Sequence, residues 1–280
     1  MRWLIQTNCF QEKGFVRLLD ALERLGLPHS VHDIVPFTMR LRPEVEVDPG
    51  EPTIVMGALK FARIARERGW WPGSFLNDYF DYRMEMIHWP GRMLNSDARF
   101  SSFANVTPPP PKWEGLFFIR PIHDSKAFNG RVVSYDEYRA WRHEVVDEGR
   151  RDGYILDGDT PVMTAQATNI SQEYRLWVVD GRVVTGSLYK LNGRSHQRAQ
   201  VDDDVVAFAQ ETVDLWGPAD AFVLDVARTA YGLFLIEAGN VNSAGFYEAN
   251  MGLIVDALER YAAKRYAAKK TPPSPGDPGS

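Results

Sequence analysis

Two short apolar stretches near the carboxyl end of the chain each carry a single carboxylate, and this pattern limits the folds that the sequence can adopt. Residues 222–227 and 233–243 are rich in β-forming side chains, and residues 228–232 are short enough to form a turn between them. Period-2 alternation predicts a β-hairpin in which Asp225 and Glu237, if they pair, project from the same face. Two buried carboxylates repel each other unless a cation lies between them. The hairpin therefore indicates a Mg²⁺ site, with two solvent-facing acids as the alternative.

Three other segments in the second half of the chain also place charged residues inside strand-like, apolar sequence. They contain Arg120, Glu173 with Arg175, and Lys190. Taken singly, each is typical of a solvated strand, because an exposed Glu–Arg pair contributes little and a lysine protects a sheet edge. Together with the carboxylate pair, they supply fixed cations and metal ligands on one predicted antiparallel sheet. A polyphosphate that binds with Mg²⁺ requires that combination.

The amino-terminal part of the chain has the pattern of a small α/β layer. Strands are expected at residues 2–7, 30–35 and 53–56, and helices with apolar residues at helical spacing are expected at residues 12–25 and 59–68. Strands that alternate with helices favour a parallel sheet. We therefore expect this part to form a layer of its own.

Four consecutive prolines at residues 108–111 form a stiff connector, which we interpret as a domain boundary. We expect an α/β domain over residues 1–107, a second domain over residues 112–266, and a disordered tail rich in Pro, Gly and Ser over residues 267–280. Residues 71–105 are aromatic and give no clear assignment. In the second domain, strands are predicted at residues 116–120, 131–134, 162–167, 174–179 and 182–191, and helices at residues 135–148, 205–216 and 246–266.

Composition and motifs narrow the functions that are open to the chain. The net charge is −5 and the sequence pI is about 5.7, so nucleic acid is not an expected partner. Cys9 is the only cysteine, which excludes an internal disulfide and a cysteine-based zinc site. No apolar stretch approaches the length of a membrane span, and we expect a cytoplasmic protein without a membrane partner. Neither a P-loop lysine motif nor a G-x-G-x-x-G motif is present, so neither of these nucleotide sites is supported.

In this combination of residues the sequence resembles the ATP-grasp superfamily. Within it, the chain is similar to a divergent branch found in phages and bacteria, which is marked by one arginine or lysine and two further lysines. The resemblance extends over roughly residues 115–262. It implies an α+β fold in which antiparallel sheets with helices form two subdomains around a nucleotide. The amino-terminal α/β layer is similar to the small pre-grasp domain that precedes such a fold.

The resemblance also implies roles for five residues. Arg120 matches the cation on the first nucleotide-binding strand, and Lys126 matches the lysine of the phosphate-covering loop that follows. Lys190 matches the second lysine and has a catalytic as well as a binding role. Glu173 matches an acid near the ribose hydroxyls, and Arg175 matches a catalytic arginine directed at the phosphoryl-transfer zone.

The metal ligands and the base-binding strand follow from the same resemblance. Asp225 and Glu237 match the paired Mg²⁺ ligands, and Gln166 lies in the strand expected at the adenine edge. The family commonly has asparagine two positions after the glutamate, whereas this chain has glycine there. Asn242 begins a stretch that fits the Asn-x-Ser/Ala-Gly-x-Tyr ending of the branch, so we expect it to be the third ligand, with Asn240 as the alternative.

The implied activity is an ADP-forming, ATP-dependent carboxylate–amine ligase that acts through an acyl phosphate. ATP with Mg²⁺, a carboxylate substrate and an amine acceptor are the implied partners, and the terminus of a peptide or protein is the preferred acceptor. Two alternatives stay open: a small-molecule kinase on the same fold, and a catalytically inactive nucleotide-binding protein. The sequence does not predict the oligomeric state.

Overall fold

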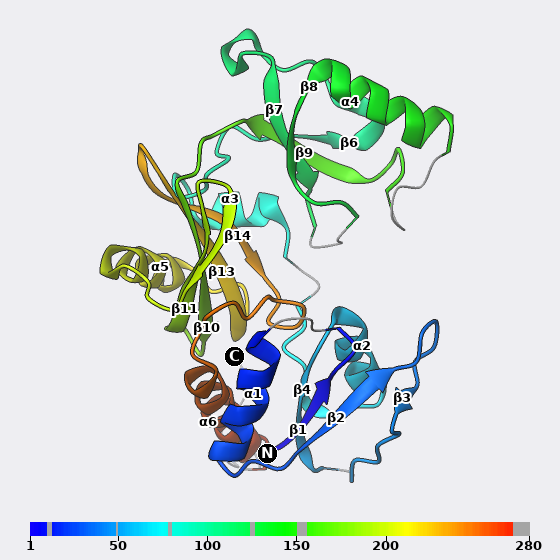
Figure 1. Cartoon of the computed structure of the whole chain (residues 1–280), viewed down its shortest axis with the longest axis vertical. Helices are drawn as coiled ribbons and strands as arrows, with labels where there is room; N and C mark the ends of the chain where they lie inside the picture. The colour runs from blue at the N-terminus through cyan, green and yellow to red at the C-terminus, as the bar shows by residue number, and fades with distance from the viewer. Residues whose placement is uncertain (10–12, 49, 78–79, 124–126, 150–155, 271–280) are drawn as a thin grey trace, which may run out of the picture.

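Within the residues that the structure describes, the chain forms three β-sheets that follow one another along the long axis of the molecule (Figure 1). The computed structural model describes residues 1–9, 13–48, 50–77, 80–123, 127–149 and 156–270, without the side chains of residues 269–270. The expected fold class, antiparallel sheets with helices preceded by an α/β layer, is confirmed within these residues.

The first sheet is mostly parallel, as the alternation of strands and helices predicted. Its region contains β1 (Arg2–Gln6), α1 (Lys13–Arg24), β2 (His29–Ile34), β3 (Leu41–Arg42), β4 (Pro52–Met56), α2 (Leu59–Glu67) and β5 (Trp71–Gly73). The strand order is β3-β2-β1-β4-β5, and β1 pairs in parallel with both β2 and β4. The short β3 pairs antiparallel at one edge. This sheet lies at the bottom of Figure 1, at one end of the molecule.

The second sheet is antiparallel and lies between the other two. It contains β10 (Gln172–Val179), β11 (Arg182–Leu191), β12 (Arg194–Arg198), β13 (Ala221–Thr229) and β14 (Gly232–Gly239), in the order β12-β11-β10-β13-β14. The predicted turn between β10 and β11 is formed by Asp180 and Gly181, which both have positive φ values, 49° and 72°. Two positive φ values are typical of the tight turn that joins twisted antiparallel strands.

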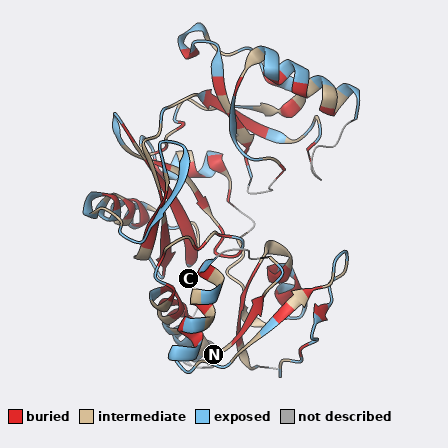
Figure 2. Ribbon diagram, viewed as in Figure 1, coloured by how far each residue is buried: buried red, intermediate tan, exposed pale blue. Residues whose placement is uncertain are grey.

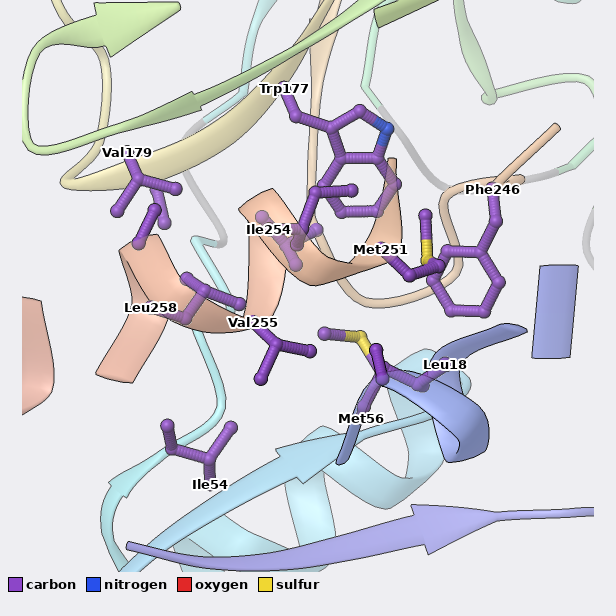
Figure 3. Packing of buried hydrophobic residues seen from close by; sticks show 14 of the residues in the cluster. Leu18, Ile54, Met56, Trp177, Val179, Phe246, Met251, Ile254, Val255 and Leu258 are labelled. Carbon is purple, nitrogen blue, oxygen red and sulfur yellow. The ribbon is translucent and has the colours of Figure 1, made fainter. Parts of the chain in front are cut away.

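Strands β10 and β13, at the centre of the second sheet, are buried over most of their length, whereas the edge strand β12 is exposed (Figure 2). On one face, Trp177 and Val179 pack against α6 (Met251–Lys270) and the strands of the first sheet (Figure 3). On the other face, Leu176 and Val178 join a core that includes residues of α5 (Asp203–Leu215). Helices α1 and α6 lie side by side (Figure 1), which joins the first layer to the second sheet through one core.

The third sheet is antiparallel, with the order β6-β9-β7-β8. It comprises β6 (Arg99–Ser102), β7 (Leu116–Pro121), β8 (Arg131–Ser134) and β9 (Pro161–Gln166), with 3-10 turns at Phe103–Asn105 and Pro111–Trp113. Helix α4 (Tyr135–Arg142) begins with a capping box between Ser134 and Glu137 and continues as a π-helix over His143–Asp147. Strand β6 precedes the proline run and pairs with β9, which follows it. The boundary between residues 107 and 112 stays a prediction.

Residues 71–105, which the sequence left unassigned, contribute β5, β6 and the short helix α3 (Tyr82–His88). The Asp81 carboxylate caps this helix by accepting a hydrogen bond of 2.8 Å from the Arg83 backbone N–H. Tyr82 and Trp89 anchor it in the core of the second sheet. A helix of seven residues is too short to show a periodic apolar face, which is why the pattern did not reveal it.

Helix α6 begins later and ends later than the predicted residues 246–266. Asn250 Oδ1 accepts a hydrogen bond of 3.3 Å from the Leu253 backbone N–H, so the side chain caps the first turn and fixes the start of the helix. The last turn extends into the segment expected as a tail, residues 267–280, of which residues 271–280 lie outside the described chain.

We expect the substitution Gly14→Ala to destabilise the fold. A Cβ atom at Gly14, on α1, would lie 2.6 Å from the Cβ of buried Phe246, and neither backbone can retreat easily. Urea unfolding should show a loss of about 1–3 kcal/mol, the usual effect of overpacking. Gly217→Ala is the matched control, because its nearest neighbouring atom would be 3.9 Å away. Equal stability of the two variants would contradict the prediction.

Candidate functional site

Strands β13 and β14 form the predicted hairpin, and Asp225 pairs directly with Glu237 in its register. Arg175 on β10 lies opposite Asp225, and Glu173 on the same strand lies opposite Lys190 on β11. Residues directly opposite in an antiparallel ladder share a face of the sheet. The structure therefore brings five of the predicted site residues together on one face.

The centre of this row is a buried ion pair between Arg175 and Asp225. Arg175 donates from Nε to Asp225 Oδ1 and from Nη2 to Asp225 Oδ2, each over 2.8 Å. Burial raises the pKa of Asp225, and the bidentate guanidinium opposes that shift. The pKa of Arg175 is raised well above its ordinary value, because the neighbouring carboxylate outweighs the effect of burial. The bidentate geometry is that of a charged guanidinium–carboxylate pair.

Two further ion pairs flank this centre. Arg120 Nη2, on β7 of the third sheet, lies 2.5 Å from Glu237 Oε2, and Lys190 Nζ lies 3.1 Å from Glu173 Oε2. The Arg120 side chain is 13% exposed, whereas that of Lys190 is 44% exposed. The Arg120 pair bridges the second and third sheets. Each of these predicted cations thus has one predicted acid as its partner.

Sequence reasoning missed Tyr189, which joins these pairs. Tyr189 lies at an irregularity of β11, where Tyr174 pairs with Leu188 and the preceding residue of β10, Glu173, pairs with Lys190. Its hydroxyl donates to Glu173 Oε2 over 2.8 Å and lies 3.3 Å from an oxygen of Asp225. A bulge of this kind turns a side chain toward a site without changing the apolar pattern. No signal in the sequence separates this tyrosine from a core residue.

Glu85 on α3 was also missed, because its helix was not predicted. Its side chain is buried, and the backbone N–H of Ala238 donates to its Oε2 over 3.3 Å. Burial raises the pKa of Glu85 to about 8; Arg120 opposes this shift and Glu237 adds to it. The ring of Tyr82, on the same helix, lies 5.5 Å from the Arg120 guanidinium carbon. Helix α3 thus contacts the Arg120 side of the site through Tyr82 and the β14 strand through Glu85.

A cavity of about 370 Å³ opens next to the ion pairs, between the second and third sheets. Its charged lining includes Arg120, Glu173, Lys190 and Glu237. Its apolar lining includes Leu94, Phe118, Phe128, Ile170 and Ile236. An apolar chamber with a charged end suits a ligand with a flat apolar part and an anionic tail.

Two predicted cofactor residues do not join the described lining of this cavity. Gln166 ends β9 with an exposed side chain, whereas Thr168 and Ile170, just beyond it, line the cavity. The nucleotide role of Gln166 stays a prediction. Lys126 lies outside the described residues.

A second, smaller cavity of about 30 Å³ adjoins the carboxylates and is lined by Asp225, Glu237 and Asn242 among others. Asn242 Nδ2 donates to the carbonyls of Val55 and Gly57, over 3.2 and 3.3 Å. With its amide group held in this way, its buried Oδ1 has no hydrogen-bond partner among the described residues. A buried acceptor without a donor is costly, and a cation would satisfy it.

These three residues fit a Mg²⁺ ion by their chemistry. Two carboxylates and one amide oxygen are hard oxygen ligands of the kind that Mg²⁺ prefers. Among the described residues there is no cluster of three or more His, Cys, Asp or Glu side chains that could hold a metal, so the candidate ligand set here combines two carboxylates with an amide oxygen. Asn240 fits less well, because its Oδ1 already accepts the Asn77 backbone N–H over 2.7 Å.

One family model matches most of the sequence. The model of the ATP-grasp domain, R2K clade family 3, matches residues 50–260, which is most of the chain. The protein belongs to this ATP-grasp family. No curated protein matches the sequence. The match begins at β4 and ends within α6, so it includes every element that carries an ion pair of the site.

Solved structures share the fold of this ATP-grasp protein at low sequence identity. D-cycloserine synthetase DcsG is 13% identical with a TM-score of 0.60, over 95% of this chain and 99% of its own. D-alanine–D-alanine ligase from Bacillus anthracis, complexed with ATP, is 9% identical with a TM-score of 0.62, over 96% and 99%. The ATP-grasp ligase PsnB, complexed with precursor peptide PsnA2 and AMPPNP, is 13% identical with a TM-score of 0.53, over 93% and 97%. Identities this low support the fold alone.

Among the helices that the structure describes, none has the length and apolar character needed to span a bilayer.

We expect Glu85→Gln to remove a pH dependence from the stability of this ATP-grasp protein. The pKa of Glu85 is raised from 4.5 to about 8, so between these values the folded state holds a proton that the unfolded chain releases. Wild-type stability should therefore fall as pH rises through this window, by up to about 1.4 kcal/mol per pH unit, whereas glutamine loses no proton. Urea unfolding from about pH 5 to about pH 8 should show a growing advantage of the variant. A constant difference across this range would contradict the assignment.

Proposed function

We propose that this ATP-grasp protein is an ADP-forming carboxylate–amine ligase that uses ATP with Mg²⁺. The observation that carries the proposal is the row of three cation–carboxylate pairs, of which the Arg120–Glu237 and Lys190–Glu173 pairs line the cavity between the second and third sheets. A purely structural role would not require so many largely buried charges in one row, because buried ion pairs seldom stabilise a fold more than apolar residues would. The same charges have a function if, when a ligand binds, the cation of each pair can bind an anionic group and the carboxylate can bind a metal ion.

Mg²⁺ and ATP together supply those counterions. Arg120, Arg175 and Lys190 carry three positive charges, and their partners in the pairs carry three negative charges. The cations can transfer from carboxylates to phosphate oxygens, which they bind by charge-assisted hydrogen bonds. The carboxylates then become free to hold the metal. No buried charge is left unpaired in either state, which allows the site to fold without its ligand.

The metal would be held by Asp225, Glu237 and Asn242, with Oδ1 of Asn242 as the third ligand. Bound by these residues, Mg²⁺ would supply positive charge that neutralises the phosphate oxygens of ATP. Apolar side chains of the cavity, with Phe118 and Phe128 among them, are suited to the base.

Arg175 is the residue best placed to act on the transferred phosphoryl group. It lines the same small cavity as the proposed metal ligands. A carboxylate oxygen of the substrate attacks the γ-phosphorus, the bond to the β-phosphate oxygen breaks, and ADP leaves. Arg175 and Lys190 then balance the charge that spreads over the phosphoryl oxygens. An amine next attacks the acyl carbon, and inorganic phosphate leaves with the electrons of the C–O bond.

For the acceptor, we propose the amino terminus of a peptide or protein. Among similar folds, the ATP-grasp ligase PsnB is described with a precursor peptide and a nucleotide analogue, which supports a polypeptide substrate here. D-alanine–D-alanine ligase supports the same reaction type with small amino acids. A hydroxyl acceptor would make the protein a kinase, and the test below separates these outcomes.

The test is ADP and phosphate release from ATP with a panel of carboxylates and amines. We expect release that depends on both substrates, and loss of at least about 99% of it in the double variant Asp225→Asn with Glu237→Gln, because removing metal ligands abolishes charge neutralisation. Circular dichroism checks that this variant folds. Full turnover in the double variant would sink the metal assignment, and a stable phosphorylated product without free phosphate would indicate a kinase.

Asn242→Ala should raise the Mg²⁺ concentration needed for ADP binding by about tenfold, because one of three protein ligands is lost. Isothermal calorimetry of ADP binding at several Mg²⁺ concentrations measures this without turnover. Asn240→Ala is the matched control. Its side chain holds the Asn77 backbone, so it should lower stability and leave the Mg²⁺ requirement unchanged. The reverse result would make Asn240 the third ligand.

A further inference from the structure

We propose, on the basis of the ligase function above, that Tyr247 is a positioning residue for Arg175 and that helix α1 sets its position through Arg17. Tyr247 lies in the segment between β14 and α6, outside the second sheet. Its ring stacks on Tyr189 with the ring centres 4.7 Å apart and the planes at 6°. The Arg175 guanidinium carbon lies 5.2 Å from the Tyr247 ring centre and 5.7 Å from that of Tyr189.

Arg175 is therefore held by two kinds of contact. Asp225 fixes it through two hydrogen bonds, and the two tyrosine rings hold it by cation–π attraction. If a metal ion binds the Asp225 carboxylate, only the two hydrogen bonds between Arg175 and Asp225 have to change. The contacts with the two tyrosine rings do not involve a carboxylate, so they keep the Arg175 guanidinium in place while the metal binds. An arginine without them would regain several rotatable bonds, which opposes an ordered geometry.

The backbone conformation of Tyr247 is not one that a tyrosine prefers by itself. Its φ of 46° is in the left-handed region, which costs a residue with a Cβ roughly 1 kcal/mol or more. Such a conformation persists only where its surroundings impose it. The surroundings here include the first layer as well as the second sheet that carries Arg175.

Three contacts from the first layer and its core hold this segment. Arg17 on α1 donates from Nη2 to the Tyr247 carbonyl and from Nη1 to the Glu248 carboxylate. The Leu59 backbone N–H, at the start of α2, donates to Ser243 Oγ over 2.9 Å. Phe246 is buried beside α1, with its ring centre 5.8 Å from that of Trp177. The amino-terminal layer thus fixes a ring that in turn fixes Arg175.

This arrangement predicts that the loss of the Tyr247 ring affects the rate of the chemical step and the affinity for ADP differently. Arg175 is assigned to the transferred phosphoryl group, which ADP lacks. Removing the ring should therefore impair the chemical step and leave ADP affinity nearly intact. A residue with a merely structural role would weaken both, because the whole site would loosen.

The experiment compares Tyr247→Leu with Tyr247→Phe in the full chain. For Tyr247→Leu we expect kcat to fall about 10- to 100-fold and the ADP dissociation constant, measured by calorimetry with Mg²⁺, to change less than about threefold. Tyr247→Phe keeps the ring and should retain most of kcat. Arg17→Met should lower kcat in the same way, since it releases the segment. Tyr231→Leu, at an 87% exposed tyrosine, is the control and should match wild type.

Two results would overturn the proposal: an unchanged kcat in Tyr247→Leu, or a loss of ADP affinity as large as the loss of kcat. If wild type shows no ligase turnover with any substrate, the proposed function fails, and a thermal unfolding cycle decides about Tyr247 instead. Its variants are Tyr247→Leu, Arg175→Lys and the double variant. The double variant should lose at least about 2 °C less Tm than the sum of the single losses, because the two residues interact. Additive losses would overturn the positioning role.

Discussion

The bidentate pair of Arg175 and Asp225 is the interaction on which the remainder of the site depends. Both residues lie on central strands of the second sheet, where the Asp225 side chain is 4% exposed and that of Arg175 is 15% exposed. Losing one partner would leave the other as an unpaired buried charge, which costs several kcal/mol. The register that opposes Arg175 to Asp225 also brings Glu237 beside them, and Tyr189 extends the network to Glu173. The sheet could not slip by one residue without breaking all of these contacts.

The amino-terminal layer has a direct part in this site as well as a packing role. Its strand ends hold Asn242 through the carbonyls of Val55 and Gly57, and its helix α1 holds Tyr247 through Arg17. The candidate third metal ligand and the ring beside Arg175 therefore both depend on how this layer contacts the second sheet. If the proposed function holds, this arrangement makes the first layer of this chain a part of the site.

Much of the fold could be predicted because it depends on local patterns. Alternating apolar residues predicted the carboxylate hairpin, and helical spacing predicted α1, α2 and α5. Helix α3 was not predicted, since seven residues give no periodic face, and Glu85 was missed with it. Within the site, Tyr189 was missed because a bulge turns it toward the acids, which the apolar pattern does not encode. The role of Gln166 is untested, although the cavity is lined by Thr168 and Ile170 instead.

The sequence by itself determined which residues carry charge within apolar strands, and hence the prediction of a site for an anionic ligand and a cation on the second sheet. It did not decide between Asn240 and Asn242, since both follow the same strand. Only the tertiary structure separates them: the Asn77 backbone N–H donates to Asn240 Oδ1, whereas Asn242, which lines the small cavity, is held by its nitrogen and its buried oxygen has no hydrogen-bond partner among the described residues. Contacts between distant segments decide such questions, because a side chain's partners depend on residues far away in the sequence.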